Sequence, residues 1–367
     1  MNNIAHLFFD AAYNFPTHVA IIEGQNKLLY QDFEKQVKQT AGMLKEKGVR
    51  KGDRVLIFVP MSVNLYRTVL AVFYLGAVAV FLDEWVSKSR MELCCKIAKC
   101  QAFVCGSKVR VLSLFSSELR AIPIKIGVKI TAASPILKKA ATVELDDAAL
   151  ITFTTGSTGA PKAANRTHGF LYQQFKALLS EINPTPSDVD MPILPIVLLC
   201  NLAVGATSVI ADFNARKPAK MKAEKVVQQI ITHQVNRITA SPFFLDHLCA
   251  HLSQKGRVMP GLKQVFTGGA PVFPQQVKEY FKVFTSASVH IAFGSTEAEP
   301  ISVIKGKEVI DGEPHITEKG LCVGTPYVDI QLKIIAVKDQ VIETKDDELK
   351  ELVLKEGDVG EIVVSGK

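Results

Sequence analysis

One short segment constrains this chain more than any other: an apolar run that leads directly into a loop rich in glycine and hydroxyl groups. The run from Leu150 to Phe153 is followed by Thr154–Gly159, and then by Pro161 and Lys162. The apolar run predicts a buried strand. Glycines let the backbone turn its N–H groups inward, and successive inward N–H groups form a concave anion site. With hydroxyl donors and a lysine added, the segment predicts a strand and a loop that holds a polyphosphate.

The loop differs from the common P-loop of nucleotide-hydrolysing enzymes. That motif has a lysine directly after its second glycine, and a serine or threonine directly after the lysine. Here Gly156 and Gly159 are three residues apart, Lys162 follows a proline, and Ala163 comes next. A plain surface turn rich in serine, threonine and glycine is the other alternative. The fixed offsets of the proline and lysine favour a phosphate-binding loop.

Strand-like and helix-like segments alternate along much of the chain. Residues 55–59 and 77–82 are apolar and rich in β-branched residues, whereas residues 64–75 carry apolar residues at helical spacing. This alternation predicts an α/β fold with two mostly parallel sheets covered by helices. β-Branched residues dominate at 328–337 and 361–364. They predict a smaller, β-barrel-like subdomain in that part of the chain.

Composition and charge narrow the classes of protein that remain. Hydrophobic residues make up 48% and charged residues 22% of the 367 residues, which is typical of a soluble globular protein. The net charge of +7 is not gathered into a long basic run, so a nucleic-acid partner is not expected. The stretch 193–210 is long enough to cross a membrane. Because Pro195, Asn201 and Gly205 interrupt it, we expect a buried strand, turn and strand instead of a transmembrane segment.

The cysteines and the N-terminus bear on location. The seven cysteines include no C-x-x-C pair, which predicts free thiols in a reducing compartment. The first residues lack the positive region of a secretory signal. We therefore expect a cytoplasmic protein, with peripheral membrane contact only to collect a lipid substrate. The sequence leaves the oligomeric state open.

Five segments, in order along the chain, resemble the motifs of the adenylate-forming superfamily, which contains acyl-CoA synthetases, luciferases and the adenylation domains of peptide synthetases. Residues 153–162 resemble its phosphate loop. The other four are residues 28–33 (family pattern LTYxEL), 74–83 (LGAVxVPLD), 293–297 (YGxTE) and 357–366 (GExGEIxVxG). The resemblance therefore covers the whole chain.

The resemblance implies a domain organisation. Residues 1–367 would form the large N-terminal domain of such an enzyme. A first α/β subdomain would span about 1–140, a second about 141–322 with the phosphate loop, and the start of a β subdomain about 323–367. Family members continue with a hinge and a small mobile C-terminal domain that carries a further lysine. This domain is missing from the chain, so we expect a part of a longer enzyme.

The resemblance also implies an activity and its residues. A carboxylic acid would react with ATP in the presence of Mg²⁺ to give an acyl adenylate and pyrophosphate. Lys162 and the loop would hold the β- and γ-phosphates, Thr296 would bond the α-phosphate, and Glu297 with Thr158 would bind the metal ion. The full set expected to bind ATP is Thr154, Thr155, Gly156, Ser157, Thr158, Gly159, Gly268, Gly269, Ala270, Pro271, Phe293, Gly294, Ser295 and Thr296.

Several of these residues have a plain structural alternative. Thr296 and Glu297 alone could be a helix N-cap with an acid in the first turn. The pair Gly268–Gly269 could be an ordinary turn. Glu299 is expected on a solvated face, and His168 as a packed or capping histidine instead of a base.

The segment expected to form the acyl pocket is aliphatic. Residues 194–205 are aliphatic apart from Asn201, where many acyl-CoA synthetases have an aromatic gate. An aliphatic wall suits a long alkyl chain, since each buried methylene contributes about 0.8 kcal/mol. The residues expected to line the pocket are Leu198, Asn201, Phe243 and Ala292.

The sequence leaves open which product is formed from the acyl adenylate. Residues 240–245, 265–274 and 293–301 resemble the branch of fatty acid CoA ligase-like proteins and olefin-pathway β-lactone synthetases, whereas residues 163–168 depart from it. In that branch the hydroxyl of a β-hydroxyacyl adenylate closes a lactone without CoA. The alternatives are therefore a CoA thioester of a long-chain fatty acid, a β-lactone, and a nucleotide-binding scaffold without turnover.

Overall fold

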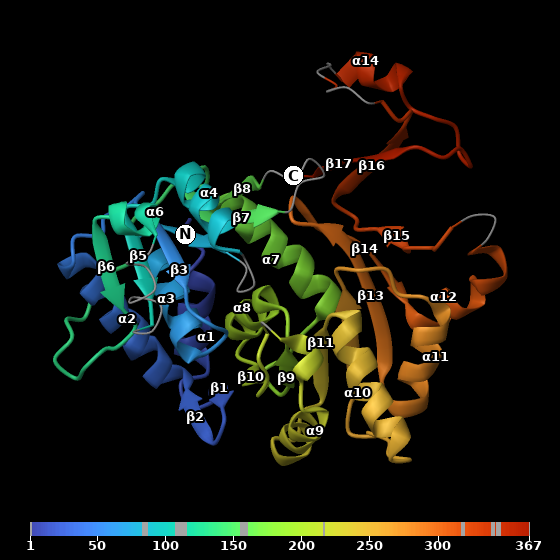
Figure 1. Cartoon of the computed structure of the whole chain (residues 1–367), viewed down its shortest axis with the longest axis horizontal. Helices are drawn as coiled ribbons and strands as arrows, with labels where there is room; N and C mark the ends of the chain where they lie inside the picture. The colour runs from blue at the N-terminus through green and yellow to red at the C-terminus, as the bar shows by residue number, and fades with distance from the viewer. Residues whose placement is uncertain are drawn as a thin grey trace.

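The computed structural model describes residues 2–82, 87–106, 116–154, 161–215, 217–316, 320–338, 342 and 346–366. Three β-sheets organise these residues (Figure 1): one of six strands, one of nine and one of two. Helices cover the two larger sheets. The predicted α/β fold is confirmed, and its third part is a small sheet.

The six-stranded sheet is parallel except at one edge. Its order is β6-β5-β3-β4-β7-β8, and only β8 runs antiparallel, to β7. The inner strands are buried along most of their length, as expected where helices cover both faces. The strands are β3 (Arg54–Phe58), β4 (Val78–Phe81), β5 (Ala102–Cys105), β6 (Ile124–Gly127), β7 (Ala148–Thr154) and β8 (Lys162–Thr167). Helix α2 (Tyr30–Glu46) precedes β3, and the helices between the strands are α3 (Val63–Tyr74), α4 (Lys88–Ala98) and α6 (Ser117–Ala121).

The nine-stranded sheet has the order β15-β14-β13-β12-β11-β9-β10-β1-β2. Its middle strands are parallel, and antiparallel strands close both edges. The strands are β1 (Val19–Glu23), β2 (Asn26–Leu29), β9 (Val189–Pro192), β10 (Thr207–Ile210), β11 (Arg237–Ala240), β12 (Gln264–Gly268), β13 (Ser288–Ser295), β14 (Ala298–Lys305) and β15 (Thr325–Pro326). Its helical elements are α8 (Pro195–Val204), η2 (Pro218–Lys220), α9 (Ala223–Thr232), α10 (Pro242–Gln254), α11 (Pro274–Val283), α12 (Gly306–Asp311) and η3 (Glu313–His315).

A layer of helices joins the two sheets. It contains α1 (His6–Asn14), α3, α8 and α7 (His168–Ile182). Their buried residues form one cluster with Val55 of β3, Ile210 of β10 and Phe266 of β12. Because a single core spans both sheets, the positions of their strand ends are fixed relative to each other. The strands β7 and β8 belong to the first sheet although they follow residue 140, and the expected subdomain ranges stay predictions.

The prediction for residues 193–210 was wrong in its first half. These residues form helix α8 followed by β10, instead of two strands. Pro195 occupies the first turn of the helix, where its missing N–H costs nothing. Gly205 ends the helix with φ of +86°. A run that is apolar at nearly every position carries no periodicity, so a helix and a strand look alike in such a sequence.

The remaining part is small. Strands β16 (Ile330–Ile335) and β17 (Glu361–Gly366) pair in antiparallel register, and α14 (Asp346–Glu351) lies between them in the chain. This part stands away from the two large sheets (Figure 1). The seven cysteines, all among the described residues, are thiols outside any disulfide, and six of them are buried. In the part of the chain that the structure describes, no helix is long and apolar enough to cross a membrane.

Candidate functional site

The first predicted element of the site is the hairpin of β7 and β8. Thr154 at the end of β7 pairs with Lys162 at the start of β8. Residues Thr155, Gly156, Ser157, Thr158 and Gly159 lie outside the described residues, as does the side chain of Thr154. The loop therefore begins and ends at the tip of an edge hairpin, and the Lys162 side chain beside it is exposed.

The second element is the hairpin of β13 and β14. Phe293, Gly294 and Ser295 end β13, and Thr296 and Glu297 form the turn before β14. The helix N-cap alternative is therefore wrong, because a strand follows the pair. A Cβ atom at residue 294 would lie 2.8 Å from the carbonyl oxygen of Ala298, so this turn requires glycine. Glu297 is exposed at the tip.

The third element lies beside the second. Gly268 ends β12 and is the register partner of Ala292 in the parallel strand β13. The two backbones approach closely, since a Cβ at residue 268 would lie 2.5 Å from the Ala292 carbonyl oxygen. Gly269, with φ of +80°, then turns the chain, and Ala270 and Pro271 are exposed. These residues lie at the carboxyl ends of parallel strands, where ligands bind in open α/β sheets.

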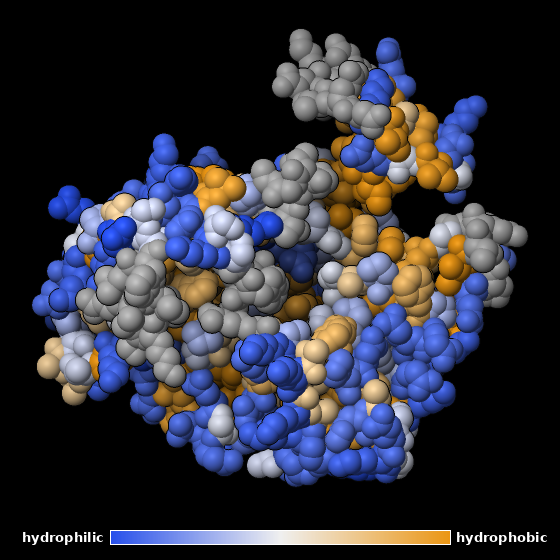
Figure 2. All heavy atoms as spheres, in the orientation of Figure 1, coloured by the Kyte–Doolittle hydropathy of each residue, from blue (hydrophilic) through white to orange (hydrophobic). Residues whose placement is uncertain are grey.

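A side chain connects the first element to the second. Arg166 of β8 donates a hydrogen bond from Nη2 to the carbonyl oxygen of Thr296, at 2.7 Å. Arg166 is four residues after Lys162, and only 7% of it is exposed. The base of the phosphate-loop hairpin and the Thr296–Glu297 turn are thus adjacent, although they belong to different sheets. Figure 2 shows the surface hollowed between the two large parts of the molecule.

Charged groups surround this contact. Burial lowers the pKa of the Arg166 guanidinium, and the carboxylates of Glu299 and Glu297 oppose that effect. Burial also raises the pKa of Glu299, which Arg166 opposes. Gln174 of α7 donates from Nε2 to Glu299 at 3.5 Å, the long limit for a hydrogen bond. Glu299 is therefore partly buried in a polar cluster, and the expectation of a solvated face was wrong.

The sequence analysis did not single out Arg166 or Gln174. In strand β8, Arg166 is the buried position, whereas the other five residues are exposed or half-buried. A charged residue at an inward position of a strand needs a partner, because burial of an unpaired charge is costly. The sequence does not say from which distant segment that partner comes.

His168 is a packed residue, as expected. Its side chain is fully buried, and its Nδ1 accepts a hydrogen bond from the backbone N–H of Ile4 at 3.3 Å. Burial lowers its pKa to about 4. The ring is therefore neutral at physiological pH. The neighbouring Thr167 caps α7 by accepting from the N–H of Phe170 at 3.1 Å.

The residues predicted for the acyl pocket lie in different environments. Leu198 and Asn201 of α8 are fully buried. The Asn201 Nδ2 donates to Asp190 at 2.9 Å and to Ser208 at 3.1 Å, so the amide nitrogen is engaged inside the core. Its Oδ1 has no hydrogen-bond partner among the described residues. Phe243 of α10 is 45% exposed. Ala292 pairs with Gly268 at the strand ends and therefore lies beside the predicted ATP residues.

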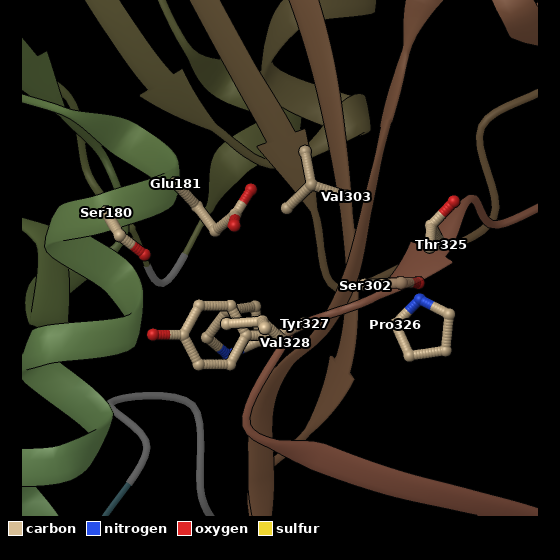
Figure 3. A pocket seen from close by; sticks show the side chains of 9 residues that line it. Ser180, Glu181, Ser302, Val303, Thr325, Pro326, Tyr327 and Val328 are labelled. Carbon is tan, nitrogen blue, oxygen red and sulfur yellow. The ribbon is translucent and has the colours of Figure 1, made fainter.

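A pocket of about 480 Å³ lies elsewhere, between the end of α7 and strands β14 and β15 (Figure 3). Ser180 and Glu181 of α7 face the strands across it. Pro300 connects it to the start of β14, next to Glu299. The four predicted pocket residues are not among its lining residues, which are Ser180, Glu181, Pro300, Ser302, Val303, Thr325, Pro326, Tyr327 and Val328.

The described residues of the site suit a metal ion that ATP brings with it. Among the described residues, no three histidine, cysteine or acidic side chains gather closely enough to hold a metal by themselves. Mg²⁺ on a nucleotide is bound through one or two carboxylates together with phosphate oxygens and water. The exposed carboxylate of Glu297, at a turn beside the strand that carries Lys162, suits that mode.

Comparison with known proteins gives one family. Residues 8–367 match the family model described as AMP-binding enzyme. The olefin beta-lactone synthetase of Stenotrophomonas maltophilia is 28% identical over 353 residues, which cover 92% of this chain and 62% of that relative. The chain thus spans less than two thirds of that relative's length.

Solved structures show the same fold. A long-chain-fatty-acid-CoA ligase from Archaeoglobus fulgidus superimposes with a TM-score of 0.81 at 21% identity, covering 99% of this chain and 74% of that one. The o-succinylbenzoate coenzyme A synthetase of Bacillus subtilis, in complex with ATP and magnesium ion, gives a TM-score of 0.77 at 21% identity. That match covers 98% of this chain and 70% of the other.

Proposed function

Because this chain belongs to the AMP-binding enzyme family, a family of ATP-dependent adenylate-forming ligases, we propose that the protein activates a carboxylic acid with ATP. A carboxylate oxygen attacks the α-phosphorus and forms the acyl adenylate. The bond between the α-phosphorus and the bridging oxygen breaks, and pyrophosphate leaves with its electron pair. The family's use of ATP and Mg²⁺ fits the residues described above.

The contact between Arg166 and Thr296 is the observation that supports this proposal most directly. The two motifs predicted to bind the triphosphate lie on different sheets, and the two residues in contact are 130 residues apart in the chain. Adenylate formation needs both at one ATP molecule, because its catalysis rests on positioning and on neutralising charge. A fold that held the two motifs far apart would not support the proposal.

Each residue has a proposed role. The positive charge of Lys162 offsets the negative charge of the leaving pyrophosphate. The Thr296 hydroxyl donates a hydrogen bond to the α-phosphate. Gly268–Pro271 line the adenine. Glu297 holds Mg²⁺, which when bound neutralises the phosphate oxygens.

For the acid, we propose a long-chain fatty acid that is transferred to CoA. The aliphatic residues of α8, Leu198 among them, support an apolar pocket, and Phe243 and Ala292 are proposed to line it with Asn201. A second product, a β-lactone formed without CoA from a β-hydroxy acid, is favoured by the similarity to the S. maltophilia synthetase. The free thiols support a cytoplasmic location.

Hydroxamate trapping tests the adenylation step. The intact protein would be incubated with ATP, Mg²⁺, hydroxylamine and saturated or 3-hydroxy acids of C8 to C18. We expect an acyl hydroxamate from at least one acid. If none forms while ATP still binds, the protein is a nucleotide-binding scaffold and the proposed function is wrong. AMP release with and without CoA then separates the products: release from a 3-hydroxy acid without CoA indicates the lactone.

A further inference from the structure

Arg166 is a buried charged residue that none of the predicted ATP contacts requires. We propose that Arg166 is a positioning residue, which holds the Thr296–Glu297 turn against the base of the phosphate-loop hairpin. Lys162 and Glu297, on either side of this contact, then reach the same ATP molecule. The expected effect on ATP binding rests on the proposed function, whereas the restraint on the Thr296–Glu297 turn does not.

The nature of the acceptor supports a positioning role. Arg166 bonds the main-chain carbonyl of Thr296 instead of a side chain, so the contact restrains the backbone of the turn. Hydrogen bonds from a charged donor are shorter and stronger than neutral ones. The contact is also shielded from water, because Arg166 is 7% exposed. A restraint on the backbone at Thr296 fixes the directions of both the Thr296 hydroxyl and the Glu297 carboxylate.

The surroundings of Arg166 show that the arginine is not explained by packing alone. Desolvation of a guanidinium costs several kcal/mol unless it is well paired. Within the described ranges, the Arg166 Nε has no hydrogen-bond partner, and neither has the Oε1 of Gln174, whose Nε2 bonds Glu299. Glu299 and Glu297 supply the opposing charge. An apolar side chain would fill the same position in β8 without this cost, so the contact with the turn is the feature that the arginine adds.

A second buried arginine provides a matched control. Arg237 of β11 is 5% exposed, and it too donates to a main-chain carbonyl, that of Asn183, at 3.1 Å. It also forms an ion pair with Asp188 at 3.1 Å. Arg237 begins β11, whereas the predicted ATP residues lie at the opposite, carboxyl ends of the strands. Its loss should therefore weaken the fold without loosening the Thr296–Glu297 turn.

The test compares Arg166→Met, Arg166→Lys and Arg237→Met with the unchanged protein. Hydrogen exchange of the amides of residues 294–298 is measured without ligand, and Mg·ATP binding is measured by calorimetry. For Arg166→Met we expect about tenfold faster exchange in this turn and about tenfold weaker Mg·ATP binding, which corresponds to ~1.4 kcal/mol. The KM for Mg·ATP should rise similarly, whereas the KM for the acid should stay within about twofold.

The controls separate positioning from general damage. Arg166→Lys keeps a charged donor without the planar fork. Exchange in the turn should therefore be faster, and Mg·ATP binding weaker, by only about two- to threefold. If Arg166→Met does not fold, Arg166→Lys tests the proposal by itself. Arg237→Met should lower the melting temperature and leave both the exchange of the 294–298 amides and Mg·ATP binding unchanged. Unaltered exchange in the Arg166 variants would overturn the proposal, as would equal loosening in Arg237→Met. If the unchanged protein forms no adenylate but Arg166→Met still loosens the turn, the proposed function fails and the positioning role stands.

Discussion

The two hairpins that carry the predicted triphosphate ligands are held by the fold in different ways. Strand β13 is paired on both sides, by β12 and β14, so backbone hydrogen bonds fix the Thr296–Glu297 turn within its sheet. Strand β8 is the edge of the six-stranded sheet and pairs with β7 alone. The edge hairpin can therefore carry a glycine-rich loop, because no further strand depends on its register. Its alignment with the other hairpin then depends on side chains such as Arg166.

The largest expected effect comes from the charged tips of the two hairpins. Glu297→Gln and Lys162→Gln should each lower adenylate formation by about a hundredfold or more, since removal of one stabilising charge or donor costs ~3–4 kcal/mol in comparable sites. Both side chains are exposed, so the melting temperature should stay within about 2 °C. Hydroxamate formation measures the rate.

The exposed Lys176 of α7 is the control for a lost surface charge. Lys176→Gln should leave the rate unchanged. If Glu297→Gln also forms hydroxamate at the normal rate, Glu297 is not a metal ligand, and only the edge hairpin then serves the triphosphate.

The next effect concerns the tight turn of the inner hairpin. Gly294→Ala places a Cβ 2.8 Å from the Ala298 carbonyl oxygen and 3.3 Å from the Cα of Glu299. Backbone atoms must move to relieve this contact, which should cost about 1–3 kcal/mol of unfolding free energy. Because Thr296 and Glu297 move with the turn, the adenylation rate should fall by roughly tenfold.

Urea unfolding and the hydroxamate assay measure the two effects on Gly294→Ala. A methyl group at Gly261 meets no atom within 4 Å, so Gly261→Ala should change neither quantity noticeably. A normal stability and rate in Gly294→Ala would mean that the inner hairpin tolerates displacement, and that ladder hydrogen bonds do not set its geometry.

The two hairpins also differ in how far the sequence predicted them. The β7 strand and the Gly268–Gly269 turn follow from local patterns, because an apolar run and glycines have direct consequences for the backbone. The loop after β7 lies outside the described residues and stays a prediction. The strand-like residues of β3 and β4 were identified for the same reason. The roles of the ATP residues came from the resemblance to a family, and they remain predictions.

What the sequence did not predict depends on distant segments. The partner of Arg166 is 130 residues away, and the cluster with Gln174 and Glu299 forms only when α7 packs along β14. The strand assignment at the start of residues 193–210 failed because α8 is apolar at nearly every position and its sequence shows no polar face. Asn201 stays a prediction for the acyl pocket; its Nδ2 donates to Asp190 and Ser208, and nothing local to α8 indicates these partners.

A smaller effect should follow from the histidine next to the edge hairpin. Burial lowers the pKa of His168 to about 4, from about 6.5 in an unfolded chain. Between these values the unfolded state binds a proton that the folded state does not, so stability falls as the pH drops from about 6.5 to about 4. Acidification from pH 7.5 to 5.0 should therefore cost ~1–2 kcal/mol through this group.

Urea unfolding at both pH values measures the contribution of His168. In His168→Asn the loss of stability on acidification should be smaller by about that amount. His233, partly exposed at the end of α9, is the control, and His233→Asn should keep the loss seen in the unchanged protein. An equal loss in His168→Asn would mean that the ring titrates normally and that the chain after β8 opens at low pH before it unfolds.

The smallest effect tests the junction between the edge hairpin and α7. Thr167 ends β8 and caps α7 by accepting from the Phe170 N–H, so Thr167→Ala should lower the unfolding free energy by about 1 kcal/mol. Thr167→Ser keeps the hydroxyl, so its unfolding free energy should fall by only a few tenths of that amount. Because Arg166 is the preceding residue, a frayed first turn of α7 would also release the hold on Thr296. Exchange of the 294–298 amides should therefore rise in Thr167→Ala but not in Thr167→Ser, and if it stays constant, the edge hairpin is held independently of the helix that follows it.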